Sequence, residues 1–203
     1  MAIDFKESKT RENLMRAFAG ESQARNRYTI AAETAREQGM FAVNQVILFT
    51  ADQERAHAKR FYDLLKNLSG TTVQIDGGYP VDHYDGVIEL LKSAHHNEME
   101  EFDSVYPTFG DVAKDEGFIE AAAAFYQIAK VEEIHAKRFA KLADMLSKNQ
   151  YYESAEESYW MCLNCGHIHH GKLVPEVCPV CRRDRGFFIP ASLAPYLECG
   201  FYK

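Results

Sequence analysis

An eight-residue motif that occurs twice constrains the fold of this 203-residue chain more than any other feature. Glu54–Phe61 reads E-R-A-H-A-K-R-F, and Glu132–Phe139 reads E-E-I-H-A-K-R-F, so six of the eight positions are identical. In a helix, Glu-x-x-His places both side chains on one face, one turn apart. The repeat therefore indicates a duplicated helical hairpin, whose two copies would face each other around a pseudo-two-fold axis.

Apolar residues recur at three- and four-residue steps through most of the chain, which predicts amphipathic helices. Breaks near Gly39, at 69–80 and at 107–117 predict four of them. Their predicted ranges are 10–38, 41–68, 83–106 and 118–147. The long connection at 69–82 is typical of the crossover in a ferritin-like bundle. We predict an all-α ferritin-like four-helix bundle at 1–147, a linker at 148–157 and a small four-cysteine metal-binding domain at 158–203.

Glutamates stand within the apolar stripes of all four predicted helices. Apolar residues flank Glu21, Glu54 and Glu132 at three-, four- and seven-residue spacings, so these carboxylates should point into the core. The third helix carries two such acids, Glu98 and Glu101. Protonation could relieve one or two buried carboxylates, but not five. Two divalent ions would leave one negative charge in excess and two trivalent ions one positive charge, so a redox-active pair of ions straddles neutrality.

The duplicated motif adds His57 and His135 to these acids. A single core-facing Glu or His is more often a satisfied polar residue than a ligand, but seven at matching depths reverse those odds. One Glu from each of two helices plus Glu-x-x-His from the other two is the ligand set of ferritin-like di-iron and di-manganese proteins. Mixed carboxylate and imidazole ligands favour iron or manganese over a structural zinc ion. Of these we favour iron.

Two C-x-x-C pairs near the C-terminus predict a second metal site. A tetrahedral set of four thiolates holds either iron or structural zinc. Taken alone the motif favours zinc, but beside a di-iron core a one-electron iron centre has an evident use. We interpret Cys199 as a free thiol, and His167, His169 and His170 as loop residues rather than ligands. The four predicted ligands are Cys162, Cys165, Cys178 and Cys181.

Composition excludes several other classes of protein. The net charge of −7 argues against binding to nucleic acid, which needs a basic face. No apolar run is long enough to span a membrane. The first ten residues show no apolar segment of a secretory signal. We therefore expect a cytoplasmic protein without nucleic-acid or membrane partners.

Together these features resemble the rubrerythrin family over essentially the whole chain. The duplicated motif, the extra Glu101 and the cysteine pairs carry the resemblance, as do the stretches Phe18–Tyr28 and Thr50–Arg55. It implies that the C-terminal domain is rubredoxin-like and holds one iron in a tetrathiolate site, and that the bundle holds an oxo- and carboxylate-bridged di-iron centre. The implied ligands of the di-iron centre are Glu21, Glu54, His57, Glu98, Glu101, Glu132 and His135.

The resemblance also implies an activity. It predicts a non-haem di-iron peroxidase that reduces hydrogen peroxide to water in oxidative-stress defence, with electrons from rubredoxin or an NAD(P)H-dependent reductase. One iron would move between Glu101 in the diferric state and His57 in the diferrous state. Tyr28 and Tyr106 match tyrosines that bond the ligating glutamates, although from the sequence alone they could equally be ordinary core residues.

The sequence leaves two alternative functions open and predicts an oligomeric state. A ferroxidase or iron-storage protein would share the bundle but would need no built-in electron donor. A non-enzymatic module with zinc at the cysteines is the second alternative. The fourth helix runs roughly 22 Å beyond Glu132, at 1.5 Å per residue, so the cysteine domain should lie far from its own di-iron site. We therefore expect a head-to-tail homodimer.

Overall fold

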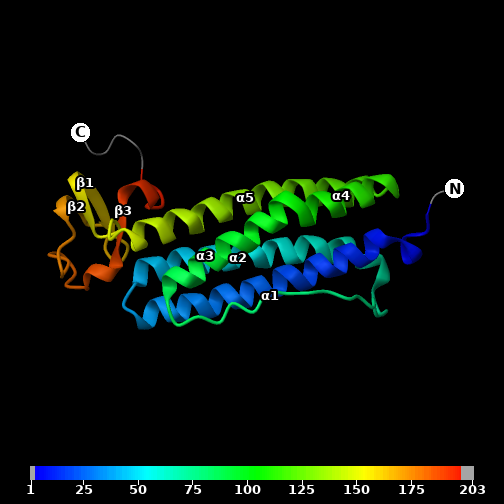
Figure 1. Ribbon diagram of the computed structural model, residues 1–203, viewed down its shortest axis with the longest axis horizontal. Helices are drawn as coiled ribbons and strands as arrows, with labels where there is room; N and C mark the ends of the chain where they lie inside the picture. The colour runs from blue at the N-terminus through cyan, green and yellow to red at the C-terminus, as the bar shows by residue number, and fades with distance from the viewer. Residues whose placement is uncertain (1–2, 198–203) are drawn as a thin grey trace.

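The computed structural model describes residues 3–197, and the predicted free thiol Cys199 lies outside that range. Within it the chain forms a long helical bundle with a small sheet at one end (Figure 1). The helices are α1 (Lys9–Glu37), α2 (Phe41–Leu64), α3 (Val87–Glu100), α4 (Tyr106–Asp115) and α5 (Ile119–Ser147). α1 packs along α2, while α3 and α4 pack along α5. The predicted ferritin-like bundle with a small C-terminal four-cysteine domain is confirmed.

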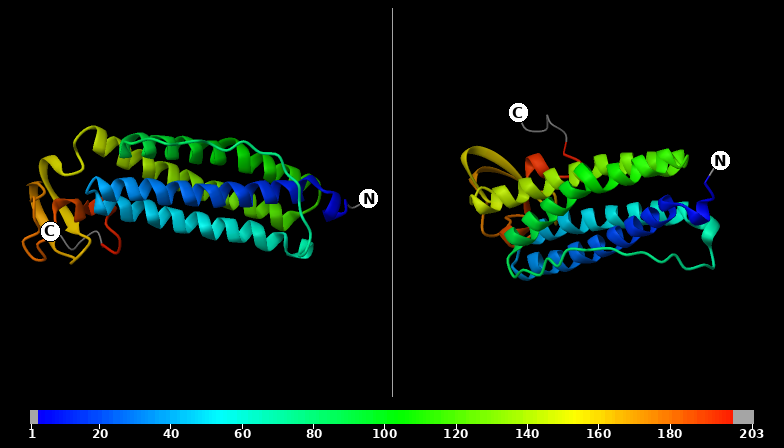
Figure 2. Two further views of the ribbon diagram at one scale, coloured as in Figure 1. Left: turned by 90° about the horizontal axis from the view of Figure 1, so that it is seen from below. Right: turned by 45° about the vertical axis from the view of Figure 1, so that its right-hand side comes forward.

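The crossover, residues 69–86, returns along α1 for most of the length of the bundle (Figure 2). Two ion pairs hold it there: Arg16 with Asp76 at 2.6 Å, and Arg27 with Asp82 at 2.5 Å. The Tyr79 hydroxyl also donates to the Arg16 carbonyl at 3.3 Å. The crossover therefore carries the chain back to the end of the bundle where α1 finishes, and the second hairpin begins there, with the Gln38 side chain bonded to the Asp85 carbonyl at 2.7 Å.

Local signals define the ends of α1. The Ser8 side chain accepts a hydrogen bond from the Arg11 N–H at 3.1 Å, which satisfies one of the free donors of the first turn. Glu116, at the far end of α4, accepts from the N–H groups of Lys9 and Thr10 at 3.0 and 2.8 Å. Gly39 has a φ of 74°, a conformation that glycine adopts readily, and reverses the chain into α2.

The third helical segment differs from its predicted range of 83–106. It begins at Val87 and passes through one π-helical turn, Glu101–Val105, into α4, so the predicted break at 107–117 is wrong except at its end. Proline disrupts an α-helix because it lacks an N–H and its ring meets the carbonyl four residues back. The Tyr106 N–H bonds the Glu101 carbonyl, five residues back, and this wider turn accommodates Pro107 at the start of α4.

Two apolar clusters fill the bundle, one on each side of the buried acids. The first contains Ala24–Ala35 of α1, Val43–Ala51 of α2, Val87–Ala94 of α3 and Phe139–Ala143 of α5 among its members. The second contains residues on the opposite side of each acid, among them Leu14, Phe61, Tyr106 and Phe125. Along each helix the glutamate therefore stands between two apolar stretches. The close-packed residues of both stretches restrict its side chain.

The C-terminal module is a three-stranded antiparallel sheet in the order β2-β1-β3. The strands are β1 (Glu153–Cys162), β2 (Ile168–Leu173) and β3 (Phe188–Pro190). β1 begins inside the segment predicted as a linker, and the exact division into domains stays a prediction. The module touches the α1–α2 turn, where the Phe41 and Phe187 rings stack with centroids 4.3 Å apart. Among the described residues, no helix is both long and apolar enough to cross a membrane.

Candidate metal centres

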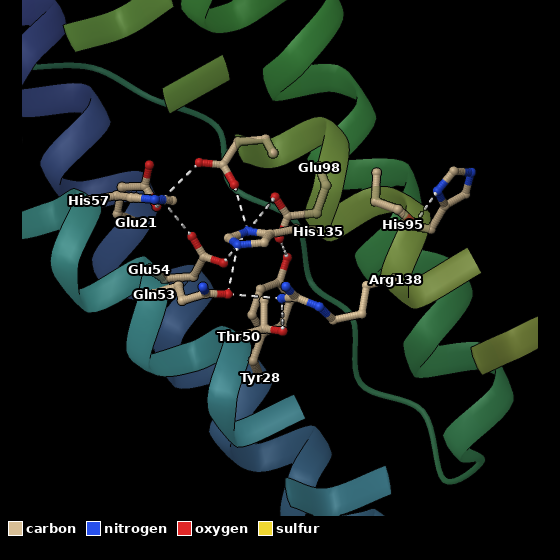
Figure 3. A network of polar contacts seen from close by, with 12 residues as sticks. Glu21, Tyr28, Thr50, Gln53, Glu54, His57, His95, Glu98, His135 and Arg138 are labelled. Atoms are coloured by element: carbon tan, nitrogen blue, oxygen red, sulfur yellow. Dashed lines mark hydrogen bonds and ion pairs between the residues drawn. The ribbon is translucent and has the colours of Figure 1, made fainter. Parts of the chain in front are cut away.

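Four helices bring glutamate and histidine side chains together inside the bundle (Figure 3). The residues form two groups, and within each group one ligand-type atom per residue lies within 4.8 Å of the others. Glu54 and Glu132, the two glutamates of the duplicated motif, belong to both groups. The first group is Glu21, Glu54, His57 and Glu132, and the second is Glu54, Glu98, Glu132 and His135.

The two histidines occupy related positions, as the duplication predicts. The Nδ1 atom of His57 lies 2.9 Å from Glu132 and 3.2 Å from Glu54. The Nδ1 atom of His135 lies 2.7 Å from Glu132 and 2.9 Å from Glu54. Their rings are stacked with centroids 5.6 Å apart. Each imidazole therefore points the same ring nitrogen at the same pair of carboxylates.

The side-chain atoms that face the centre are buried and unpaired. No partner within residues 3–197 hydrogen-bonds these atoms: Oε2 of Glu21, Oε1 of Glu54, Oε2 of Glu98, both Oε atoms of Glu132, and Nδ1 of His135. An unpaired buried polar atom is costly, and several negative ones side by side are more so. All of these atoms are metal-ligand types, and cations between them would satisfy every one. The residues present therefore fit a di-iron centre.

The protonation behaviour of the acids has the same cause. Burial raises the pKa of Glu21 to about 7, and the charge of Glu54 adds to the effect. Burial and neighbouring carboxylates also hold the pKa of Glu98 and of Glu132 well above the usual range. For His57, burial favours the neutral ring, but the carboxylates around Nδ1 outweigh it and raise its pKa. The cluster thus favours added positive charge.

Glu101 lies beside the two groups rather than in either of them. It is the first residue of the π-helical turn and is half-buried. It lines a cavity of about 280 Å³ between α1, the start of α4 and the crossover, together with Arg16, Arg27 and Tyr106. Burial, with the charges of Glu21 and Glu98, holds the pKa of Glu101 well above its usual range. Glu101 is thus close enough for the charges of the cluster to raise its pKa, but it lies on the side that faces the cavity.

Tyr28 and Tyr106 both contact glutamates of the cluster. The Tyr28 hydroxyl donates to Oε1 of Glu98, and the Tyr106 hydroxyl donates to Oε1 of Glu21. Both tyrosines are buried. In each carboxylate the other oxygen, Oε2, is the unpaired one that faces the centre. The tyrosines therefore orient the carboxylates.

Sequence reasoning missed three polar residues behind His135. Its Nε2 atom lies 3.1 Å from Oε1 of Gln53, which also accepts from the Arg138 guanidinium at 2.9 Å. The same guanidinium nitrogen donates to the Thr50 hydroxyl at 2.8 Å (Figure 3). The sequence contains one sign that the two copies differ here: Val131 stands at the position that the duplication makes equivalent to Gln53.

The four cysteines of the C-terminal module form the second centre. Sγ atoms lie 3.7 Å apart between Cys162 and Cys181, and between Cys165 and Cys178. A tetrahedron with metal–sulfur bonds of roughly 2.3 Å has sulfur–sulfur edges of roughly 3.8 Å, so the spacing fits one metal ion. Cys162 and Cys178 are buried, whereas Cys165 is exposed, which leaves one side of the site near solvent.

The three histidines near the cysteines do not belong to this group. His167 precedes β2, in agreement with the predicted loop. His169 and His170 lie on strand β2, so their prediction as loop residues is wrong. The His170 ring stacks on Tyr159 with centroids 4.3 Å apart, because the two residues are cross-strand partners.

The fold and the two centres define a class of protein: a ferritin-like bundle with a carboxylate-rich di-iron site and an attached rubredoxin-like iron module. The rubrerythrin family model matches residues 12–143, and the model of the rubrerythrin rubredoxin-like domain matches residues 160–189. The chain belongs to the rubrerythrin family, which implies an oxidoreductase.

Individual relatives agree with this assignment. The chain is 45% identical to rubrerythrin of Clostridium perfringens over 90% of this chain and 94% of the relative. It is 37% identical to rubrerythrin of Nitratidesulfovibrio vulgaris, with the same coverage. Among solved structures, a mixed-valence state of nigerythrin aligns with a TM-score of 0.60 at 28% identity, covering 91% of this chain and 90% of that one.

Proposed function

We propose that this protein is a non-haem di-iron peroxidase that reduces hydrogen peroxide to water. The observation that carries the proposal is the presence, in one chain, of a buried carboxylate and imidazole cluster and a separate four-thiolate site. The first suits two iron ions and the second a one-electron iron centre. An iron-storage protein would need only the first.

The proposed ligands follow from the geometry. Glu54 and Glu132 belong to both groups and would help to hold both ions. Glu21 and His57 would be the remaining ligands of one ion, and Glu98 and His135 those of the other. Glu101 would bind from the cavity side. Tyr28 and Tyr106 would hold Glu98 and Glu21 with one oxygen turned inward.

The overall reaction consumes two electrons and two protons for each hydrogen peroxide and gives two waters, with cleavage of the O–O bond. When bound, the two iron ions supply the two electrons. The cavity beside Glu101 provides space of about 280 Å³ for a small polar substrate to reach the cluster. Glu100 lines this cavity and is itself exposed, so the cavity reaches the surface. Solvent there supplies the protons. Apolar clusters on both sides exclude water elsewhere.

Electrons would arrive one at a time at the thiolate site, from a reduced rubredoxin or an NAD(P)H-dependent reductase. The module lies beyond the end of the bundle (Figure 1). Glu54 and Glu132, in contrast, stand near the middle of α2 and of α5. α5 alone extends roughly 22 Å from Glu132 to its end, at 1.5 Å per residue. We therefore propose a head-to-tail homodimer in which each module serves the di-iron site of the other chain.

An anaerobic titration tests the activity. The iron-loaded, fully reduced protein is mixed with hydrogen peroxide, and reduced rubredoxin is then supplied. We expect one peroxide consumed for every two electrons and sustained turnover. Cys162→Ser is the control, since it should keep a single oxidation of the di-iron site but lose rubredoxin-coupled turnover. Accumulation of a ferric mineral without peroxide consumption would instead favour the ferroxidase alternative.

A mixing experiment tests the dimer. Cys162→Ser chains lack a working module, and Glu54→Ala chains lack a working di-iron site. If the module serves the partner, refolding the two variants together should restore turnover, because a mixed dimer pairs one intact module with one intact site. Dimers by analytical ultracentrifugation that show no recovery on mixing would refute transfer between chains.

A further inference from the structure

The duplicated motif is symmetric in its ligands but asymmetric behind them. His57 and His135 occupy equivalent positions, 78 residues apart. The Nε2 atom of His135 has Gln53 as a partner, and Gln53 is held by Arg138. The positions equivalent to Thr50 and Gln53 are occupied by Ile128 and Val131, which have no polar side-chain atom. The network behind His135 therefore has no counterpart behind His57.

The arginine of the duplicated motif differs between the two copies as well. Arg60 is the equivalent of Arg138, but it pairs with Glu120 on the surface at 2.9 Å. Across residues 3–197 the structure shows no hydrogen-bond partner for Nε2 of His57. The His57 side chain is 13% exposed, whereas that of His135 is fully buried.

Hydrogen-bond chemistry fixes the form of His135. A guanidinium can only donate, so the atom of Gln53 that faces Arg138 must be its carbonyl oxygen. That oxygen also faces Nε2 of His135, and an amide oxygen can only accept. Nε2 must therefore carry the proton, which leaves a lone pair on Nδ1 if the ring is neutral. Nδ1 is the atom that points at Glu54 and Glu132.

We propose that Gln53, oriented by Arg138, is a positioning residue that fixes His135 in one tautomer as an imidazole ligand, a restraint that His57 lacks within the described part of its own chain. Burial of the ring and a bond at its far nitrogen hold His135 in one orientation and one tautomer. The His57 side chain is 13% exposed and, among the described residues, lacks the bond at its far nitrogen. The duplication therefore yields two histidines from the same motif, of which only His135 is held at both ring nitrogens. This inference rests on the proposed role of both histidines as metal ligands, and it does not depend on peroxide turnover.

The test replaces Gln53 in the full-length chain. Gln53→Met keeps the length of the side chain but removes the acceptor, whereas Gln53→Glu keeps an acceptor for both His135 and Arg138. Zinc(II) is loaded as a diamagnetic probe, and ¹⁵N NMR follows the histidine N–H protons. The wild-type protein should show a slowly exchanging proton on Nε2 of His135. Gln53→Met should lose it and bind zinc in the bundle about tenfold more weakly, or worse.

Three further variants separate positioning from packing. Gln53→Glu should retain the slow proton and the zinc affinity. Val131→Met, which places the same residue type at the duplicated position, should leave both unchanged. Arg138→Met should make the Nε2 proton of His135 exchange faster. This effect should largely disappear in the Gln53→Met background, since both substitutions act through one contact. The proposal is overturned if Gln53→Met keeps the slow proton, if Gln53→Glu fails as Gln53→Met does, or if Val131→Met weakens binding equally. If the NMR and zinc-binding results are as expected but the protein has no peroxidase activity, only the proposed function is refuted.

Discussion

At Glu21 and Glu98 the two oxygens of one carboxylate have different surroundings. A tyrosine hydroxyl occupies Oε1, and Oε2 is buried and unpaired. Oxygens that were free to exchange would give the carboxylate several orientations. The hydroxyls of Tyr28 and Tyr106 remove that freedom without adding charge.

Tyr28→Phe should therefore weaken metal binding without disrupting the fold. The substitution leaves Oε1 of Glu98 buried without a donor, and loss of such an orienting bond typically lowers metal affinity about 10-fold or more. Competition with a coloured chelator measures the affinity. Tyr126→Phe is the matched control, because the Tyr126 hydroxyl donates to Asp111 at the surface. Equal affinities for the two variants would contradict the orienting role.

Glu116 offers a prediction on stability and pH. Partial burial opposes its ionisation, but hydrogen bonds from Thr10 and from the N–H of Lys9 outweigh this and lower the pKa of Glu116. Because its pKa is lower in the folded chain, Glu116 stabilises the fold above the pKa of the unfolded chain. The contribution disappears as the pH falls through the folded pKa. Glu116→Gln should cost about 1–2 kcal/mol at neutral pH, as for a lost helix cap.

Chemical denaturation of the wild type and of Glu116→Gln at a series of pH values would check this. The difference in free energy of unfolding should be largest at neutral pH and should vanish in acid. Glu120→Gln serves as the control, since Glu120 pairs with Arg60 on the surface. A pH-independent difference would show that the charge of Glu116 is not the cause.

The positions of the buried acids were predictable from the sequence, since each stands in the middle of an apolar stripe. The positions of Gln53 and Arg138 were not. They lie at the edge of the apolar stripe, where a polar side chain is equally consistent with solvent exposure. Only the packing of α2 against α5 determines that Arg138 turns towards Thr50.

At the scale of the elements, the extents of α1, α2 and α5 follow from periodicity and from the glycines at their ends. The third helical segment could not be predicted, because Pro107 is a strong signal for a helix end. A π-helical turn has no comparable signal in sequence. It keeps the chain helical past the proline and places Glu101 at the first residue of the turn.

If the π-helical turn exists to accommodate Pro107, the two features should be coupled. Deleting Ser104, an exposed residue of the turn, would tighten it to an α-helix and place Pro107 in a helix interior. We expect a loss of about 3 kcal/mol in the free energy of unfolding. Deleting Ser104 together with Pro107→Ala should recover most of that loss. A deletion that costs the same with and without the proline would refute the coupling. Urea denaturation gives both values.

At the scale of the whole molecule, the contact between the sheet module and the bundle was not predictable. It depends on Gly39, in the α1–α2 turn, and Gly186, near β3, which the sequence shows only as turn residues. A side chain on Gly186 would overlap the carbonyl oxygen of Gly39, so the two backbones approach closely only because Gly186 has none. The nearby stack of Phe41 on Phe187 depends on this approach.

Gly186→Ala should therefore detach the module from the bundle while each keeps its own fold. The visible absorption of ferric thiolate should be unchanged, but proteolysis between Ser147 and Glu153 should become faster. Gly78→Ala is the control, since a methyl group there meets no atom within 4 Å. Unchanged proteolysis of Gly186→Ala would show that the junction tolerates the added methyl group.

The crossover has a consequence for how the molecule could be divided. It lies on the outside of the bundle and joins two hairpins that each hold part of the proposed ligand groups: Glu21, Glu54 and His57 before it, and Glu98, Glu132 and His135 after it. Cutting the chain at Gly77 and Gly78 would give two fragments, neither of which contains a complete ion-binding group. Their reassociation would then be expected to depend on ferrous ion, so the severed protein would act as a sensor whose two halves join when iron is present.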